Sequence, residues 1–281
     1  MGCCDSKEVK SDDLKGIVRD KYGKIAAAGS MGCGCGCSND PEEVFSVLKD
    51  DYSGIEGYVP EADLNLGCGI PTAYADIKPG DTVIDLGSGA GNDCFVARQL
   101  VGEKGLVIGI DMTPEMIDRA KANVEKLGFT NVQFRLGEIE NLPVTANKAD
   151  VVISNCVINL VPDKYMAFHE IIRVLKPGGH FCISDVVSEG TIPAELVAQA
   201  ELYAGCISGA LPIEEYLQII RLTGFTNVEI KKKKHNELPD DLLNEILSPD
   251  EANAFKKSAV GFYSITVTGV KPTCQDHACA S

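Results

Sequence analysis

The amino-acid sequence predicts an α/β protein with a mostly parallel sheet, and three observations support this fold class. Between residues 72 and 230, short apolar runs alternate with amphipathic stretches of about 10 to 15 residues, which is typical of βαβ units. The first apolar run ends in a glycine-rich turn, at the place where open α/β sheets bind ligands. The length of 281 residues, with 44% hydrophobic and 24% charged residues, suits one large soluble domain and a smaller accessory region.

The apolar runs give the expected strands, which lie at residues 82–85, 106–111, 132–136, 151–154, 180–187, 228–232 and 262–270. The amphipathic stretches give the clearest helices, at residues 93–100, 113–127, 164–175 and 213–223. The second of these helices opens with Thr113-Pro114 and ends before Gly128, which are typical residues for a first turn and a C-terminal cap.

We expect three regions along the chain: an N-terminal helical extension at residues 1–71, the sheet domain at 72–234, and a small C-terminal region at 235–281. The extension contains an insert in which glycine and cysteine alternate, so we expect an exposed loop that carries Cys33, Cys35 and Cys37. A helix is expected to begin at Asp40-Pro41. The C-terminal tail carries Cys274 and Cys279 without a regular pattern.

Composition excludes several classes of function. No apolar run approaches the ~20 residues that a membrane-spanning helix needs, so we expect no membrane partner. The net charge of −15 opposes binding to nucleic acid, and the short lysine run at residues 231–234 is expected to be a solvent-exposed strand end. Twelve cysteines in a long chain whose first thirty residues lack a signal peptide indicate a cytoplasmic protein with reduced thiols.

A candidate nucleotide site follows the first expected strand, in the run Asp85-Leu86-Gly87-Ser88-Gly89-Ala90-Gly91. Glycines in such a turn allow a ligand to approach the backbone at the N-terminus of the next helix, as in a Rossmann-like doubly wound sheet. Asp85 would repel a pyrophosphate and attract a ligand with positive charge, such as the amino group of a methionyl moiety. Asp111 ends the second strand, where it can accept both ribose hydroxyls. NAD is the alternative cofactor for this pattern.

Three of the cysteines are candidates for binding a substrate. Cys156 follows the expected strand at 151–154, at the end of the sheet where ligands bind, and Cys68 and Cys206 are flanked by glycines. Cys94 and Cys182 fall within a helix and a strand, so we expect them to be buried hydrophobic residues.

Three thiolates without a cluster of carboxylates or histidines select a thiophilic centre, and their wide spacing does not fit a structural zinc site. Trivalent arsenic fits better, because it bonds to three sulfurs and keeps a nucleophilic lone pair. On this interpretation the thiols bind the methyl acceptor, no resident metal and no general base are required, and His169 and His180 are ordinary helix and strand residues.

The motifs at 72–230 resemble, in order and spacing, those of class I S-adenosylmethionine-dependent methyltransferases. Besides the glycine turn and Asp111-Met112, they include Gly137-Glu138-Ile139 and the Lys176-Pro177-Gly178-Gly179 run. The resemblance implies S-adenosylmethionine as the cofactor. It also implies that Met112 belongs to the cofactor site, that Gly137, Glu138 and Ile139 lie along the adenine, and that Asn155 lies near the reacting end of the cofactor.

A closer resemblance, to arsenite methyltransferases, covers residues 22 to about 211 and is carried by Tyr22-Gly23, Leu66-Gly67-Cys68-Gly69, 154–160 and 206–211. It implies that Cys156 and Cys206 bind As(III), that Cys68 is the third ligand or a redox partner, and that Tyr22 and Gly23 close over the cofactor. The family has one further N-terminal cysteine, for which Cys33, Cys35 and Cys37 are the candidates.

The function expected from this resemblance is methyl transfer from S-adenosylmethionine to arsenite or methylarsenite, in arsenic detoxification. Because methylation oxidises As(III) to As(V), an external reductant of the thioredoxin or glutathione type is needed before another round. Two alternatives stay open: a methyltransferase acting on carbon or oxygen of a small molecule, with incidental cysteines, and a non-enzymatic thiol protein that binds metalloids. The first alternative predicts that turnover does not depend on Cys156. The second predicts that the protein binds arsenite without any dependence on S-adenosylmethionine.

Overall fold

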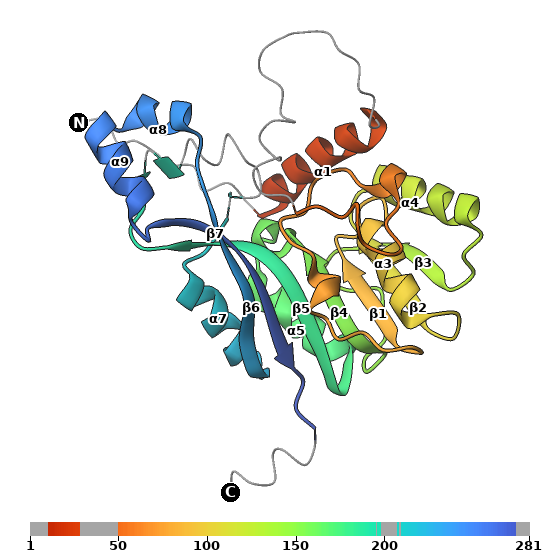
Figure 1. The fold of residues 1–281 in the computed structure, drawn as a ribbon. Coiled ribbons are helices and arrows are strands. Elements are labelled where there is room, and N and C mark those ends of the chain that lie inside the picture. The colour runs from red at the N-terminus through yellow and green to blue at the C-terminus, as the bar shows by residue number, and fades with distance from the viewer. Residues whose placement is uncertain (1–10, 29–49, 195, 198–206, 208, 274–281) are drawn as a thin grey trace, which may run out of the picture.

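The computed structural model describes residues 11–28, 50–194, 196–197, 207 and 209–273. Within these residues, seven strands form one sheet in the order β3-β2-β1-β4-β5-β7-β6 (Figure 1). The strands are β1 (Thr82–Leu86), β2 (Leu106–Asp111), β3 (Val132–Leu136), β4 (Ala149–Asn155), β5 (Leu175–Glu189), β6 (Thr226–Asn236) and β7 (Gly261–Val270). The first five strands are parallel, and β7 runs antiparallel between β5 and β6. The predicted α/β class with a mostly parallel sheet is confirmed.

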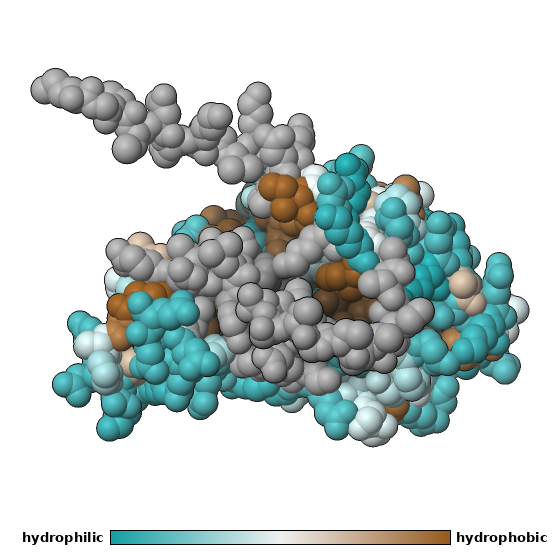
Figure 2. Space-filling model, turned by 90° about the horizontal axis from the view of Figure 1, so that it is seen from above, coloured by the Kyte–Doolittle hydropathy of each residue, from teal (hydrophilic) through white to brown (hydrophobic). Residues whose placement is uncertain are grey.

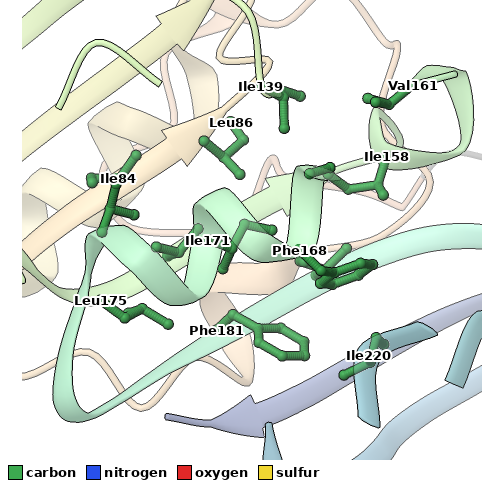
Figure 3. Close-up of a cluster of buried hydrophobic side chains, with 14 of the residues drawn as sticks. Ile84, Leu86, Ile139, Ile158, Val161, Phe168, Ile171, Leu175, Phe181 and Ile220 are labelled. Atoms are coloured by element: carbon green, nitrogen blue, oxygen red, sulfur yellow. The ribbon is translucent and has the colours of Figure 1, made fainter. Parts of the chain in front are cut away.

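Helices cover both faces of the sheet. The α-helices assigned in the part of the chain described above are α1 (Ser11–Ala28), α3 (Asn92–Val101), α4 (Pro114–Leu127), α5 (Lys164–Val174), α7 (Ile213–Leu222), α8 (Asp240–Ile246) and α9 (Pro249–Lys257). Buried side chains of α3 and α4 pack with one face of the strands, and those of α5 and α7 pack with the other. On the second face, Phe168 of α5, Phe181 of β5 and Ile220 of α7 lie together (Figure 3).

The central strands are apolar along their whole length because both of their faces are covered. Alternate residues of β1 show this directly, since Val83 packs on the α3 side and Ile84 on the α5 side, each without exposed surface. After β3 the chain returns to the middle of the sheet, where β4 lies beside β1. The two halves of the sheet therefore meet between these two strands. A crevice forms at such a point, outside the carboxyl ends of the strands, so the fold places a ligand site there.

Some of the predicted ends of helices and strands are confirmed, and others differ from the structure. Gly128 ends α4 in the left-handed conformation, with φ of 69°, and its N–H donates to the carbonyls of Val124 and Glu125. The helix expected to run through residue 175 ends at Val174, because β5 begins at Leu175, which pairs with Ala149 of β4. The strand expected at 228–232 is longer, since pairing with β7 continues through the lysine run to Asn236.

The lysine run lies on the edge strand β6 and is neutralised locally. Lys232 and Lys234 pair with Asp50, and Lys233 pairs with Glu189. The run lies inside β6 and not at a strand end as predicted, with Lys231 and Lys233 exposed and Lys232 and Lys234 partly buried. None of the helices in the described ranges combines the length and the apolar character needed to cross a membrane.

Two helices near the C-terminus, α8 and α9, were not predicted. Ser248 begins α9 with a capping box, in which its side chain and that of Glu251 satisfy each other's main-chain N–H groups. The helix expected at Asp40, the glycine and cysteine insert, and the tail with Cys274 and Cys279 all lie outside the described residues.

Candidate active site

A cavity lies at the carboxyl ends of the neighbouring strands β1, β2 and β4, with α1 on its open side. Figure 2 looks onto this end of the sheet, where hydrophobic residues are visible near the middle of the face and hydrophilic residues lie mostly towards its edges. Twelve of the residues predicted for the site line this cavity: Tyr22, Asp85, Gly87, Ser88, Gly89, Asp111, Met112, Gly137, Glu138, Ile139, Asn155 and Cys156. The folded chain thus brings together motifs that are separated by more than a hundred residues of sequence.

Two of the predicted glycines do not line the cavity. Gly91 lies at the N-cap of α3 with φ of 103°, and a Cβ there would lie 2.8 Å from the Phe134 ring. Its small size therefore serves helix packing against the sheet. Gly23 faces the Glu115 carboxylate instead, which would lie 3.4 Å from an added Cβ.

Asp111 closes the glycine turn from the end of β2. Its Oδ2 accepts a hydrogen bond from the Gly89 N–H at 2.9 Å, and its Oδ1 accepts one from the Thr113 N–H at 2.8 Å. Burial raises the pKa of this carboxyl, and the main-chain N–H groups partly oppose that shift. Asp111 lines the cavity beside the glycine turn, which is where the resemblance places the ribose of the cofactor.

Two further carboxyl groups, Asp85 and Asp93, line the cavity with little solvent around them. Asp85 is 2% exposed, and burial, followed by the nearby Asp93, holds its pKa well above the ordinary value. Burial likewise raises the pKa of Asp93 to about 6, against the hydrogen bonds that it receives from Asn155 and Tyr52. Neither carboxyl group has a salt bridge to a cationic side chain among the residues that the structure describes, and two such groups favour a ligand with positive charge in this cavity.

Unsatisfied polar atoms also point to a ligand. Among the residues that the structure describes, Ser88 Oγ and Asn92 Oδ1 are buried without a hydrogen-bond partner, and both residues line the cavity. Buried polar groups are nearly always paired, so a polar ligand that reaches these atoms would complete the site. The glycine turn, the acids and these two atoms together fit S-adenosylmethionine, which carries an amino acid group, a sulfonium and a ribose.

Of the cysteines that the structure describes, Cys156 is the one that lines the cavity. It follows the last residue of β4 with φ of 62°, a conformation that is uncommon for a residue with a side chain, and it is 2% exposed. Cys68 is also 2% exposed and belongs to the same buried cluster, together with Val186, Ile207 and Phe262. Cys68 lies behind the cavity wall formed by Leu66 and Gly67.

The remaining predicted cysteines divide into two groups. Cys206, Cys33, Cys35 and Cys37 lie outside the described residues. Cys94 and Cys182 are fully buried in α3 and β5, as predicted. Cys94 also contacts the cavity wall, because its Sγ donates a hydrogen bond to Asp85 Oδ2 at 3.2 Å, a contact that the sequence did not predict.

Three more residues of the site were not predicted. Asp93 had a sequence signal, since it lies in the first turn of the helix that follows the glycine turn. Tyr52 had none, because it lies in a segment without regular structure; its hydroxyl donates to Asp93 Oδ1 at 2.8 Å. Lys15 of α1 pairs with Glu138 at 2.7 Å and Glu140 at 3.0 Å, which fixes α1 over the turn after β3.

Comparison with known proteins assigns the family. Residues 77–238 match a family model described as a methyltransferase domain. Over 277 residues the chain is 35% identical to an arsenite methyltransferase of Aquipseudomonas alcaligenes, covering 92% of this chain and 74% of the relative. The chain belongs to the arsenite methyltransferase family. A second arsenite methyltransferase, from Halobacterium salinarum, is 44% identical over 233 residues, which is 79% of this chain and 60% of the relative.

A solved structure of an arsenic methyltransferase also resembles this chain. The crystal structure of an arsenic(III) S-adenosylmethionine methyltransferase from Chlamydomonas reinhardtii superposes with a TM-score of 0.61 and 34% identity, covering 83% of this chain and 75% of that one. The fold is accordingly the Rossmann-like class I methyltransferase fold that the sequence predicted. The chain spans about 60% of the length of the Halobacterium relative.

Proposed function

We propose that this protein transfers methyl groups from S-adenosylmethionine to trivalent arsenic, as arsenite or methylarsenite, in arsenic detoxification. The observation that carries the proposal is the position of Cys156. Its thiol stands at the end of β4 on the wall of the cofactor cavity, with Cys68 buried in the same cluster. The family membership supports the same substrate, since the relatives named above are arsenite and arsenic(III) methyltransferases.

Different residues of the cavity would contact the different parts of the cofactor. Asp111 and Met112 would hold the ribose, the turn from Gly137 to Ile139 would hold the adenine, and Tyr22 would cover the outer side. Asp85 and Asp93 take the cationic methionyl end, next to the glycine turn at Gly87 and Gly89. The cofactor supplies the electrophilic methyl carbon, and the remaining contribution of the protein is to hold the acceptor atom in line with that carbon.

Cysteine thiols bind arsenite by exchange, because each As–OH and S–H pair is replaced by an As–S bond and a water molecule. Cys156 and Cys68 supply two sulfurs, and Cys206 would supply another, with one of Cys33, Cys35 and Cys37 as an auxiliary thiol. The arsenic lone pair is then the nucleophile, so no side chain has to remove a proton. Positioning of reactants can lower a barrier by roughly 7–11 kcal/mol, and the burial of both described thiols keeps water away from the As–S bonds.

Turnover needs a reductant from outside the chain. Methyl transfer oxidises As(III) to As(V), and two electrons from thiols restore the trivalent state. A protein or small molecule of the thioredoxin or glutathione type fits this role, and the cytoplasm, where thiols stay reduced, is the compartment that suits the reaction.

A reconstituted reaction tests the proposed function. Purified full-length protein is incubated with arsenite, S-adenosylmethionine and a thiol reductant, and arsenic species are separated by chromatography. Methylated arsenic is expected only when all three small molecules are present. If the protein binds S-adenosylmethionine but forms no methylated arsenic, the proposed function is wrong.

Cofactor affinity is expected to rise with pH through about 6, because a cationic ligand binds the ionised form of Asp93, whose pKa is about 6. Below that pH, affinity should fall by up to about tenfold per pH unit for this single group. The stability of the ligand-free protein should change the other way, since a carboxyl whose pKa is raised from 3.8 loses stability as pH rises towards 6. Equilibrium dialysis between pH 5 and 8 measures the first effect, and Asp93→Asn should flatten the profile. An unchanged slope in that variant would assign the titration to another group.

A further inference from the structure

The side-chain amide of Asn155, the last residue of β4, holds the loop that carries Cys68. Its Oδ1 accepts a hydrogen bond from the Cys68 N–H at 3.0 Å, and its Nδ2 donates to the Gly69 carbonyl at 2.8 Å. One amide therefore binds a main-chain donor and a main-chain acceptor on adjacent residues. A carboxylate or an aliphatic side chain at this position cannot make both bonds.

The glycines on either side of Cys68 allow the loop to approach the sheet closely. A Cβ on Gly67 would lie 2.5 Å from Asn155 Nδ2, and a Cβ on Gly69 would lie 2.5 Å from Ser184 Oγ. Neither glycine is among those with positive φ, so the site needs their small size rather than their conformational freedom. The Cys68 loop therefore lies directly against the carboxyl end of β4 and against Ser184 of β5.

Cys156 is hydrogen-bonded to the same part of β5. It follows Asn155 in the chain, and its N–H donates to the Ser184 carbonyl at 2.8 Å. Asn155 and Ser184 are themselves paired across β4 and β5. The backbones of both cysteines are therefore held by hydrogen bonds to the paired residues Asn155 and Ser184. Both cysteines also belong to one buried apolar cluster.

Two residues of the cavity wall fix the orientation of the Asn155 amide. Its Nδ2 lies 2.9 Å from the Tyr52 hydroxyl and 3.1 Å from Asp93 Oδ2. The Tyr52 hydroxyl in turn lies within hydrogen-bond distance of Asp93 Oδ1 and of the Gly69 carbonyl, at 2.8 and 3.0 Å. These acceptors surround the NH2 side of the amide, so its oxygen is left facing the Cys68 N–H.

We infer that Asn155 is a positioning residue, which sets the Cys68 sulfur relative to the Cys156 sulfur so that one trivalent arsenic atom can bind both. The inference rests on the proposed function for the identity of the ligand. It differs from the role of Asn155 in lining the cofactor cavity, because it acts through the Cys68 backbone and needs no cofactor.

The test uses phenylarsine oxide, a trivalent arsenical that bonds to two thiols, and omits S-adenosylmethionine. All variants are made in the full chain with serine at seven cysteines, so that the auxiliary thiols and the terminal cysteines cannot bind the probe: Cys3, Cys4, Cys33, Cys35, Cys37, Cys274 and Cys279. Affinity is measured by competition with a small dithiol. Asn155→Ala removes both hydrogen bonds to the loop and is expected to weaken binding about tenfold, which is the effect of one to two net hydrogen bonds.

A double-mutant cycle separates positioning from other effects. If Asn155 acts through Cys68, Asn155→Ala will have no further effect on arsenical affinity in a protein that already carries Cys68→Ser. Equal losses from Asn155→Ala in both backgrounds would overturn the inference. It is also overturned if Cys68→Ser leaves the affinity unchanged, because the two cysteines then do not form a binding pair.

Asn131→Ala provides a matched control at the opposite end of the sheet. Its amide also donates to two main-chain carbonyls, those of Gly102 at 2.8 Å and Gly105 at 3.0 Å. This variant is expected to lower stability without changing arsenical affinity, and a tenfold loss here would show that Asn155→Ala acts by general destabilisation. Since no cofactor is present, a failure of methyl transfer with intact arsenical binding would refute the proposed function and leave this inference standing.

Discussion

Cys156→Ser is expected to reduce arsenite methylation by at least about 100-fold, equivalent to about 2.7 kcal/mol, while S-adenosylmethionine still binds. Oxygen is a poor ligand for trivalent arsenic, so the serine variant loses one of the bonds that hold the acceptor at the cavity wall. The cofactor contacts of Asp85 and Asp111 do not involve the sulfur. Chromatography of the arsenic products measures turnover, and equilibrium dialysis measures cofactor binding in the same preparation.

Cys182→Ser is the control for loss of a buried thiol. Cys182 is fully buried in β5, and its Sγ donates to the Pro71 carbonyl at 3.2 Å, a hydrogen bond that serine can replace. This variant should keep most of the activity. Should Cys156→Ser turn over arsenite as fast as the unsubstituted protein, the substrate is not held by this thiol, and a methyltransferase for another small molecule becomes the better interpretation.

Asp85→Asn is expected to lower cofactor affinity by about 100-fold and, at the same time, to raise the melting temperature of the ligand-free protein. The two effects share one cause. Burial and Asp93 hold the pKa of Asp85 well above its ordinary value, so its contribution to stability is full below the unfolded pKa and is lost as pH rises through the raised folded pKa. Asparagine has no charge to desolvate at neutral pH, but it also has no charge to pair with the methionyl ammonium. Calorimetry of the ligand-free and cofactor-bound protein measures both quantities.

Asp185→Asn separates these two effects. Asp185 lies on β5, is fully buried, and has its pKa raised to about 7 by burial, yet it does not line the cavity. The Tyr216 hydroxyl donates to its Oδ2 at 3.0 Å and the Val186 N–H donates to its Oδ1 at 3.0 Å, so an asparagine can keep only one of these bonds. We expect this variant to keep its cofactor affinity, because the residue does not line the cavity. Equal losses of affinity in both variants would mean that Asp85 acts on the fold and not on the ligand.

Much of the fold could be predicted because the central strands are buried on both faces. β2 and β3 have the predicted bounds, since their apolar runs end at an acid or a turn. The sequence pattern was less informative where pairing alone defines a strand. β6 extends through four lysines because its backbone pairs with β7, and a half-exposed edge strand carries no apolar pattern. α8 has only 7 residues, too few for a periodic signal.

The site was predictable to the extent that its residues lie in continuous motifs. Gly87, Ser88 and Gly89 could be identified from adjacent positions, and they do line the cavity. The network around Asn155 could not be identified, because Tyr52 meets it across 103 positions of sequence and no local pattern records that contact. Cys94 was correctly predicted to be buried, but its hydrogen bond to Asp85 depends on how α3 docks on β1.

The positive φ of Cys156 has a consequence for how this position changes during evolution. Holding a residue with a side chain in the left-handed region costs of order 1–3 kcal/mol, and glycine or asparagine at residue 156 would relieve most of it. Under selection for backbone stability alone, the cysteine would therefore be replaced by one of these residues. A descendant that had lost the need for the thiol should show this replacement early, so a retained cysteine here reports selection for chemistry.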